Sequence, residues 1–210
     1  LELLVRYQVH ATWATVGLIM CEDAQDALAQ APEFRPRWAD PRLDSYAALA
    51  SLRAEDHAAH FAPDLVRQIS AAPGQELGTH TFAHYPPLDA GYDELSFRED
   101  LRAAIRVTQR YGPPARSLVF PRNQVPPQSL PVCAQEGIEV YRGTLPGLLE
   151  QPRSLREGSL SLPRALRLLD AYLPLRASDC YPVPAALPGL PLNLPGSRQL
   201  RPGREVATVC

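Results

Sequence analysis

Segments typical of buried strands alternate with segments typical of amphipathic helices along most of this chain. The strand-like segments are rich in β-branched or apolar residues and lie at 9–16, 76–79, 117–120 and 138–141. The helix-like segments lie at 1–7, 18–30, 63–73, 96–112, 129–136 and 163–172. Alternation at this spacing is the pattern of βαβ units with a parallel sheet. It predicts an α/β fold, either a (β/α) barrel or a doubly wound sheet.

Composition excludes several classes of partner. All 21 basic residues among the 210 are arginines, 23 acidic residues outnumber them, and the formal net charge is -2. We therefore expect no nucleic-acid partner. The apolar stretch at residues 7–21, which carries no charged side chain, is shorter than the about 18 apolar residues that span a membrane, so we expect no transmembrane segment. The four cysteines are far apart, which argues against a metal knuckle or a disulfide scaffold.

The two ends of the chain differ in character. The sequence opens within an amphipathic helix and has no initial methionine, whereas residues 174–210 are rich in proline. We expect residues 1–173 to form most of one barrel domain and residues 174–210 to be a loop segment of the same domain, with flanking parts missing at both ends. We expect a cytoplasmic location, although a signal peptide would precede Leu1 and export therefore stays open.

Two of the five histidines stand close together just after a predicted strand. His80 and His84 are four residues apart, and Gly78 allows close backbone approach. This spacing lets two imidazoles converge on one metal ion when the segment is helical or tightly looped. The alternative is a pair of hydrogen-bonding histidines with no ligand. In a barrel, functional groups gather where strands end, which also directs attention to residues 121–125 and 142–143.

Three segments, taken in order, resemble one known family. Residues 76–84, with His80 and His84, resemble the His-x-x-x-His metal motif of the polysaccharide deacetylases, the carbohydrate esterases with NodB homology. Residues 9–17 resemble the second strand of that family. Residues 119–124 resemble the loop in which many members carry Arg-x-Pro-Tyr, although the order here is Pro-Arg-Asn-Gln.

The resemblance implies a deformed (β/α) barrel, incomplete in this chain, that holds a divalent metal, commonly zinc. It assigns His80 and His84 as two metal ligands and Arg122 as a catalytic residue that holds a carboxylate; the alternative for Arg122 is a surface arginine. The family's acidic motif, which supplies the base and third ligand, would precede Leu1. Its general acid, a histidine, would lie beyond Cys210, because no histidine follows His84.

Two further residues are candidates for substrate binding. His60 precedes the predicted helix at 63–73, where a solvated or capping role is the alternative to lining a substrate groove. Arg142 follows the predicted strand at 138–141 and either reaches the site or pairs with a surface carboxylate.

The resulting hypothesis is a metal-dependent hydrolase that removes N-acetyl or related acyl groups from a carbohydrate. A metal ion polarises the unreactive amide carbonyl and lowers the pKa of bound water, which explains the use of histidine ligands. The alternatives are a glycan-binding barrel without activity and a metal-dependent amidohydrolase that acts on a cyclic amide.

Overall fold

A computed structural model describes residues 1–143 and 185–196, and these residues contain one parallel sheet. Its strands are β1 (Ala11–Thr15), β2 (Gln75–Thr79), β3 (Ser117–Val119), β4 (Val140–Arg142) and β5 (Leu192–Asn193). The strands lie side by side in chain order, and each neighbouring pair is parallel. The predicted α/β class with a parallel sheet is therefore confirmed.

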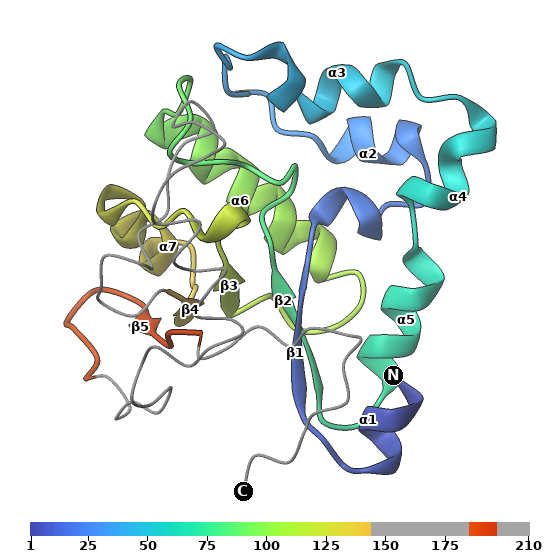
Figure 1. The fold of residues 1–210 in the computed structure, drawn as a ribbon, viewed down its shortest axis with the longest axis vertical. Helices are drawn as coiled ribbons and strands as arrows, with labels where there is room; N and C mark the ends of the chain where they lie inside the picture. The colour runs from blue at the N-terminus through green and yellow to red at the C-terminus, as the bar shows by residue number, and fades with distance from the viewer. Residues whose placement is uncertain (144–184, 197–210) are drawn as a thin grey trace, which may run out of the picture.

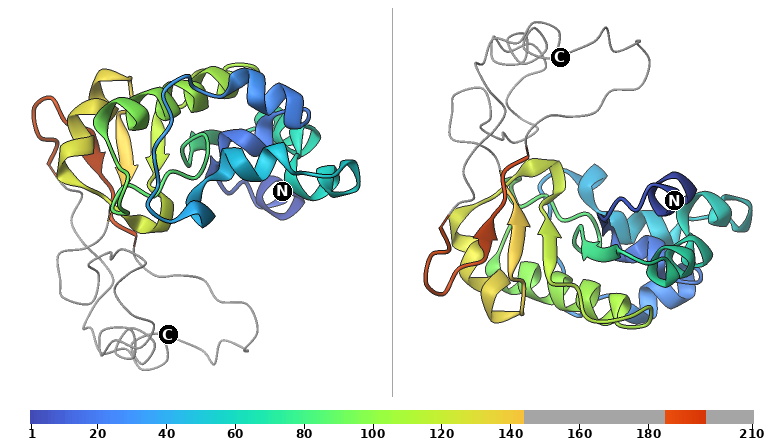
Figure 2. Two further views of the ribbon diagram at one scale, coloured as in Figure 1. Left: turned by 90° about the horizontal axis from the view of Figure 1, so that it is seen from above. Right: turned by 90° about the horizontal axis from the view of Figure 1, so that it is seen from below.

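Helices connect the strands from β1 to β4 and pack against the sheet (Figures 1 and 2). The described α-helices are α1 (Glu2–Arg6), α2 (Ala24–Gln30), α3 (Ser45–Ala50), α4 (His57–His60), α5 (Pro63–Ala71), α6 (Glu94–Thr108) and α7 (Leu130–Gln135). Short 3-10 helices include η1 (Gly17–Met20) after β1 and η4 (Pro121–Asn123) after β3. In Figure 1, α2, α3 and α4 lie beyond the carboxyl ends of β1 and β2. The candidate residues that follow the strands therefore lie at the same end of the sheet, where the carboxyl ends of the parallel strands meet.

Helix α6 joins the two hydrophobic clusters of the core. Its residues Ala103, Ala104 and Val107 pack in one cluster with Met20, Phe82 and residues of α2, α3 and α5. Its residues Phe97 and Leu101 pack in the other cluster with Leu118, Phe120 and residues of α7 and β4. One amphipathic helix thus fixes both the loop after β2 and the strands β3 and β4.

Several predicted elements have different bounds in the structure. The predicted helix at 18–30 is divided into η1 and α2, because the side chain of Asp23 accepts a hydrogen bond from the backbone N–H of Asp26 and starts a new helix. Helix α6 begins at Glu94 instead of residue 96, because Asp93 caps it: the carboxylate of Asp93 accepts from the N–H of Ser96. The predicted strand at 138–141 begins later, at Val140.

Other expectations concern the region before α5 and the C-terminal part. The region between the predicted helices at 18–30 and 63–73 contains α3, which was not predicted; Asp44 caps it by accepting from the N–H groups of Tyr46 and Ala47. Within the predicted loop segment at 174–210, the structure places β5 beside β4. The predicted helix at 163–172 lies outside the described residues. Within residues 1–143 and 185–196, no helix is long and apolar enough to cross a membrane.

The position of α6 predicts which of its leucines stabilises the fold. We expect Leu101→Ala to lower the free energy of unfolding by about 2–5 kcal/mol, because Leu101 is fully buried and its loss leaves a cavity. Leu95→Ala on the same helix, where the side chain is 47% exposed, should change it by less than about 0.5 kcal/mol. Urea unfolding followed by circular dichroism measures both. Equal effects would contradict this packing.

Candidate functional site

The loops that follow β2 and β3 hold an unusual backbone conformation. Among the described residues other than glycine, those with positive φ are Gln8, Thr81, His84, Arg122 and Asn123. All but Gln8 lie in these two loops. The left-handed region is unfavourable for residues with a Cβ, and most of all for a β-branched one such as Thr81, with φ of 64°. Such conformations persist only where surrounding contacts impose them, and they cluster at functional sites.

A buried carboxylate imposes the conformation of the loop after β2. Asp100, on α6, is fully buried, and its two oxygens accept from the backbone N–H groups of Phe82, at 2.7 Å, and Ala83, at 3.2 Å. The hydroxyl of Tyr46, on α3, donates to the same carboxylate at 3.1 Å. Burial raises the pKa of Asp100 to about 6, whereas these hydrogen bonds act in the opposite direction.

Further hydrogen bonds join residues within this loop and join the loop to the residues that follow β1. The Thr81 hydroxyl accepts from the N–H of Tyr85 at 2.7 Å, and the Thr81 carbonyl accepts from the N–H of Gly17 at 2.9 Å. A Cβ at Gly17 would come within 2.6 Å of the Phe82 ring. Glycine is therefore required where the end of β1 passes this loop.

The two predicted metal ligands lie next to each other. The ring centroids of His80 and His84 are 4.9 Å apart, with the rings at 61°. The Nδ1 atom of His80 lies 2.7 Å from the carbonyl oxygen of Val119, at the end of β3. Because that carbonyl can only accept, Nδ1 of neutral His80 carries the proton and Nε2 keeps its lone pair. An imidazole oriented in this way is suited to ligate a metal ion.

The surroundings favour the neutral form of both imidazoles. Burial lowers the pKa of His80, and the positive charge of Arg142 lowers it further. Burial also lowers the pKa of His84, with further contributions from His80 and from the charge of Arg122. A neutral imidazole is the form that binds a metal ion.

The donor set fits a divalent metal only in part. Two neutral imidazoles supply two nitrogen ligands, whereas zinc sites in enzymes usually have three protein ligands. Across residues 1–143 and 185–196, no group of three or more His, Cys, Asp or Glu side chains is placed to hold one ion. Cys21 and Cys133 are free and buried, and burial raises the pKa of each thiol to about 12.

The two predicted arginines lie on the β3 and β4 side of the histidines. Arg122, in η4, donates from its guanidinium to Asp89 at 3.0 Å, and the Asp89 side chain is only 6% exposed. Arg142, at the end of β4, donates to the side-chain oxygen of Asn123 at 2.7 Å. Arg122 therefore holds a carboxylate of this chain, and Arg142 supports the strained η4 turn.

His60 and His84 line the same cavity. His60 is the exposed last residue of α4, and the cavity of about 270 Å³ that it shares with His84 has mainly apolar walls. Its lining residues are Val16, Leu18, Ile19, Ser45, Ala48, Leu49, Leu52, His60, Phe61, Ala83 and His84. The structure thus brings His80 and His84 together, and His60 lines the cavity on the β1 side of this pair.

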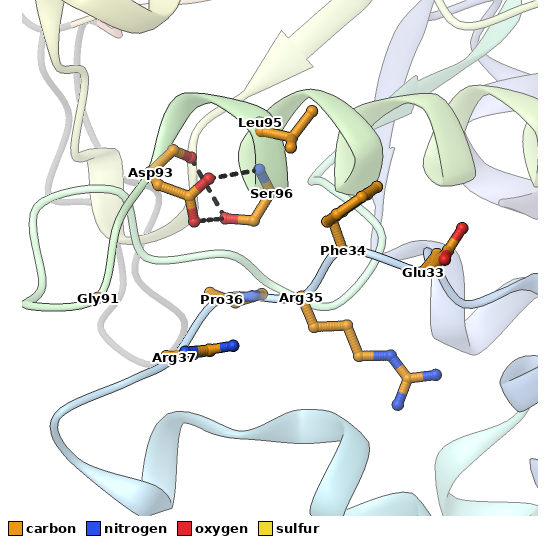
Figure 3. A pocket seen from close by; sticks show the side chains of 9 residues that line it. All are labelled: Glu33, Phe34, Arg35, Pro36, Arg37, Gly91, Asp93, Leu95 and Ser96. Carbon is orange, nitrogen blue, oxygen red and sulfur yellow. Dashed lines mark hydrogen bonds between the residues drawn. The ribbon is translucent and has the colours of Figure 1, made fainter.

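A larger cavity lies away from all of these residues. It has a volume of about 530 Å³ and lies at the N-terminus of α6. Figure 3 shows that Asp93 and Ser96 bond to each other at its wall. None of the predicted site residues lines it, so its size does not make it the candidate site.

Sequence reasoning missed Asp89 and Asp100. Asp100 lies on the face of α6 that also carries Phe97, Leu101 and Ala104, all buried. An aspartate on an apolar helix face is a signal, because buried carboxylates are rare unless they are paired or hydrogen-bonded. Asp89 lies in an irregular loop, where no periodicity marks it.

Comparisons with known proteins add no relative. No model of a protein family matches the chain, and a search of curated proteins finds no match. The candidate site is therefore defined by its own geometry.

The hydrogen bonds of Asp100 predict a large loss of stability when the carboxylate is removed. Asp100→Ala leaves two buried N–H groups without an acceptor, each at about 1–3 kcal/mol, so we expect a loss of about 2–6 kcal/mol in the free energy of unfolding. Tyr46→Phe removes one hydroxyl bond and should cost about 1 kcal/mol. Urea unfolding compares the two. A smaller loss in Asp100→Ala than in Tyr46→Phe would show that this carboxylate does not hold the loop.

The lowered histidine pKa values predict a pH dependence of the metal-free protein. Below about pH 6.5, the ordinary pKa of histidine, the unfolded chain binds protons on these imidazoles that the folded chain does not bind. The two imidazoles therefore do not lower the free energy of unfolding above this pH, and the free energy of unfolding falls as the pH drops below it. The double variant His80→Gln, His84→Gln should lose less stability on acidification than the wild type. Parallel unfolding curves over this pH range would contradict the prediction.

Proposed function

We propose that this chain belongs to a metal-dependent hydrolase that removes N-acetyl or related acyl groups from a carbohydrate and resembles the polysaccharide deacetylases. The observation that carries the proposal is the His80–His84 pair with the Nδ1 of His80 bonded to the Val119 carbonyl. The finer fold in the proposal is a deformed (β/α) barrel. Parallel strands that lie side by side in chain order support it, because this is how strands follow one another around a barrel.

His80 and His84 would hold the metal ion, for which zinc fits the nitrogen donors best. The bound metal would supply polarisation of the amide carbonyl and a water of lowered pKa. The Val119 carbonyl keeps the proton of His80 on Nδ1 and so keeps Nε2 available. The bonds of Asp100 to the loop hold the two rings in place before a ligand arrives.

The arginines have supporting roles in this proposal. The contact of Arg122 with Asp89 supports a role in positioning a carboxylate, and the exposed Arg142 is suited to donate hydrogen bonds to sugar hydroxyls. His60 would contact the substrate at the rim of the cavity. Hydrolysis also requires a base for the attacking water and an acid for the leaving amine, and we assign neither role to a described residue.

A second candidate is a glycan-binding module without catalytic activity. The observation in its favour is that the described residues bring together only two metal donors. The two proposals differ in their dependence on metal. Amine release from acetylated chitooligosaccharides that requires zinc would support the hydrolase. Glycan binding that is the same with and without zinc, and without amine release, would support the binding module.

The metal site makes a direct prediction. We expect His80→Gln and His84→Gln each to weaken zinc binding by about a hundredfold or more, because a site loses most of its affinity with one of its ligands. His57→Gln is the control, since His57 lies on α4 with its ring against Phe61. Isothermal titration with zinc measures the affinities. Unchanged zinc affinity in both site variants would refute the assignment.

A further inference from the structure

The cavity beside His84 is formed by segments on the β1 side of the candidate site. Its walls come from η1 with Val16, from α3 with Leu52, from the end of α4 with Phe61, and from Ala83 and His84. The sheet order places β1 on one side of β2 and places β3 and β4 on the other side. The cavity and the arginines therefore lie on opposite sides of the loop that carries the two histidines.

The walls of this cavity suit an apolar group and not a sugar. Eight of the eleven lining residues are aliphatic or aromatic, and none is Asp, Glu or Arg. The hydroxyl of Ser45 already donates to the Ala83 carbonyl at 3.0 Å. A sugar placed here would leave most of its hydroxyls without hydrogen-bond partners, which is costly. The polar side chains Arg122, Asn123 and Arg142 lie on the other side of the histidines, where a sugar can be bound.

The size of the cavity exceeds the needs of an acetyl group. Its volume is about 270 Å³. An apolar cavity of about 150 Å³ in another protein takes up a whole benzene molecule. An acetyl group would place only one methyl group in this space and leave the rest of the apolar wall in contact with water.

We propose that this cavity binds the acyl chain of the substrate amide, and that this chain is longer than acetyl. This inference rests on the proposed hydrolase and names its substrate class: a sugar amide with an aliphatic acyl group of intermediate length, such as butanoyl or hexanoyl. His84 lies at the junction, because it belongs both to the cavity wall and to the histidine pair. The scissile carbonyl then lies at the histidines, the acyl chain on the β1 side, and the sugar on the β3 and β4 side.

The test uses binding and does not depend on activity. N-acetyl-, N-butanoyl- and N-hexanoylglucosamine are titrated into the zinc-free chain, and the dissociation constants are measured by NMR. Burial of one methylene group corresponds to about fourfold in affinity. We expect affinity to rise by about this factor for each added methylene. Equal affinity for the three amides would overturn the inference.

A matched pair of variants locates the binding. Ala47 and Ala48 are both exposed residues of α3, but only Ala48 lines the cavity. Ala48→Phe fills the cavity and should remove the preference for the longer chains, while Ala47→Phe should keep it. Leu52→Ala widens the cavity and should move the preference towards octanoyl, which provides a second readout if Ala48→Phe does not fold. Equal effects of the two phenylalanine variants, together with no shift in Leu52→Ala, would overturn the inference.

The outcomes separate this inference from the function on which it rests. If zinc binding depends on His80 and His84 but the affinity for the sugar amides does not depend on acyl-chain length, the proposed hydrolase stands and the acyl pocket is refuted. Affinity that rises with chain length and falls in Ala48→Phe, without zinc binding at the histidines, would support an apolar ligand pocket and refute the hydrolase.

Discussion

The candidate site depends on the buried carboxylate of Asp100. This side chain has no contact with solvent, and it accepts backbone hydrogen bonds from Phe82 and Ala83, inside the loop that carries both histidines. Without these acceptors, the loop would have to bury two N–H groups alone, at about 1–3 kcal/mol each. The hydroxyl of Tyr46, on α3, donates a further hydrogen bond to this carboxylate. One carboxylate thus joins α6, α3 and the loop after β2.

This anchor explains how the loop tolerates an unfavourable backbone. Thr81 and His84 both have positive φ, a conformation that costs of order 1–3 kcal/mol at each non-glycine residue. The hydrogen bonds of Thr81 to Tyr85 and Gly17 add to those of Asp100 and over-determine the turn. The result is a pair of imidazoles that is positioned before any ligand binds. Preorganisation of this kind reduces the conformational entropy that the loop loses when a ligand binds.

The site also divides into two chemically different halves. On the β1 side, apolar side chains surround a cavity that reaches His84. On the side of β3 and β4, Arg122 and Arg142 are exposed and engage Asp89 and Asn123. The charges of these arginines help to lower the pKa values of the histidines. A substrate with an apolar part and a hydroxylated part matches this division.

The sequence by itself determined the parallel α/β class, the helices α5, α6 and α7, and the position of His80 and His84 after a strand, because these depend on local periodicity and on the residues that end helices. Only the tertiary structure decided which side chains meet. Asp100 reaches the N–H of Phe82 across 18 residues, and Arg122 reaches Asp89 across 33. The fact that His60 and His84 line the same cavity depends on how α3 and α4 fold over the carboxyl ends of the strands. Contacts of this kind depend on how the segments that connect parallel strands pack together. This packing produces no periodic pattern in the sequence.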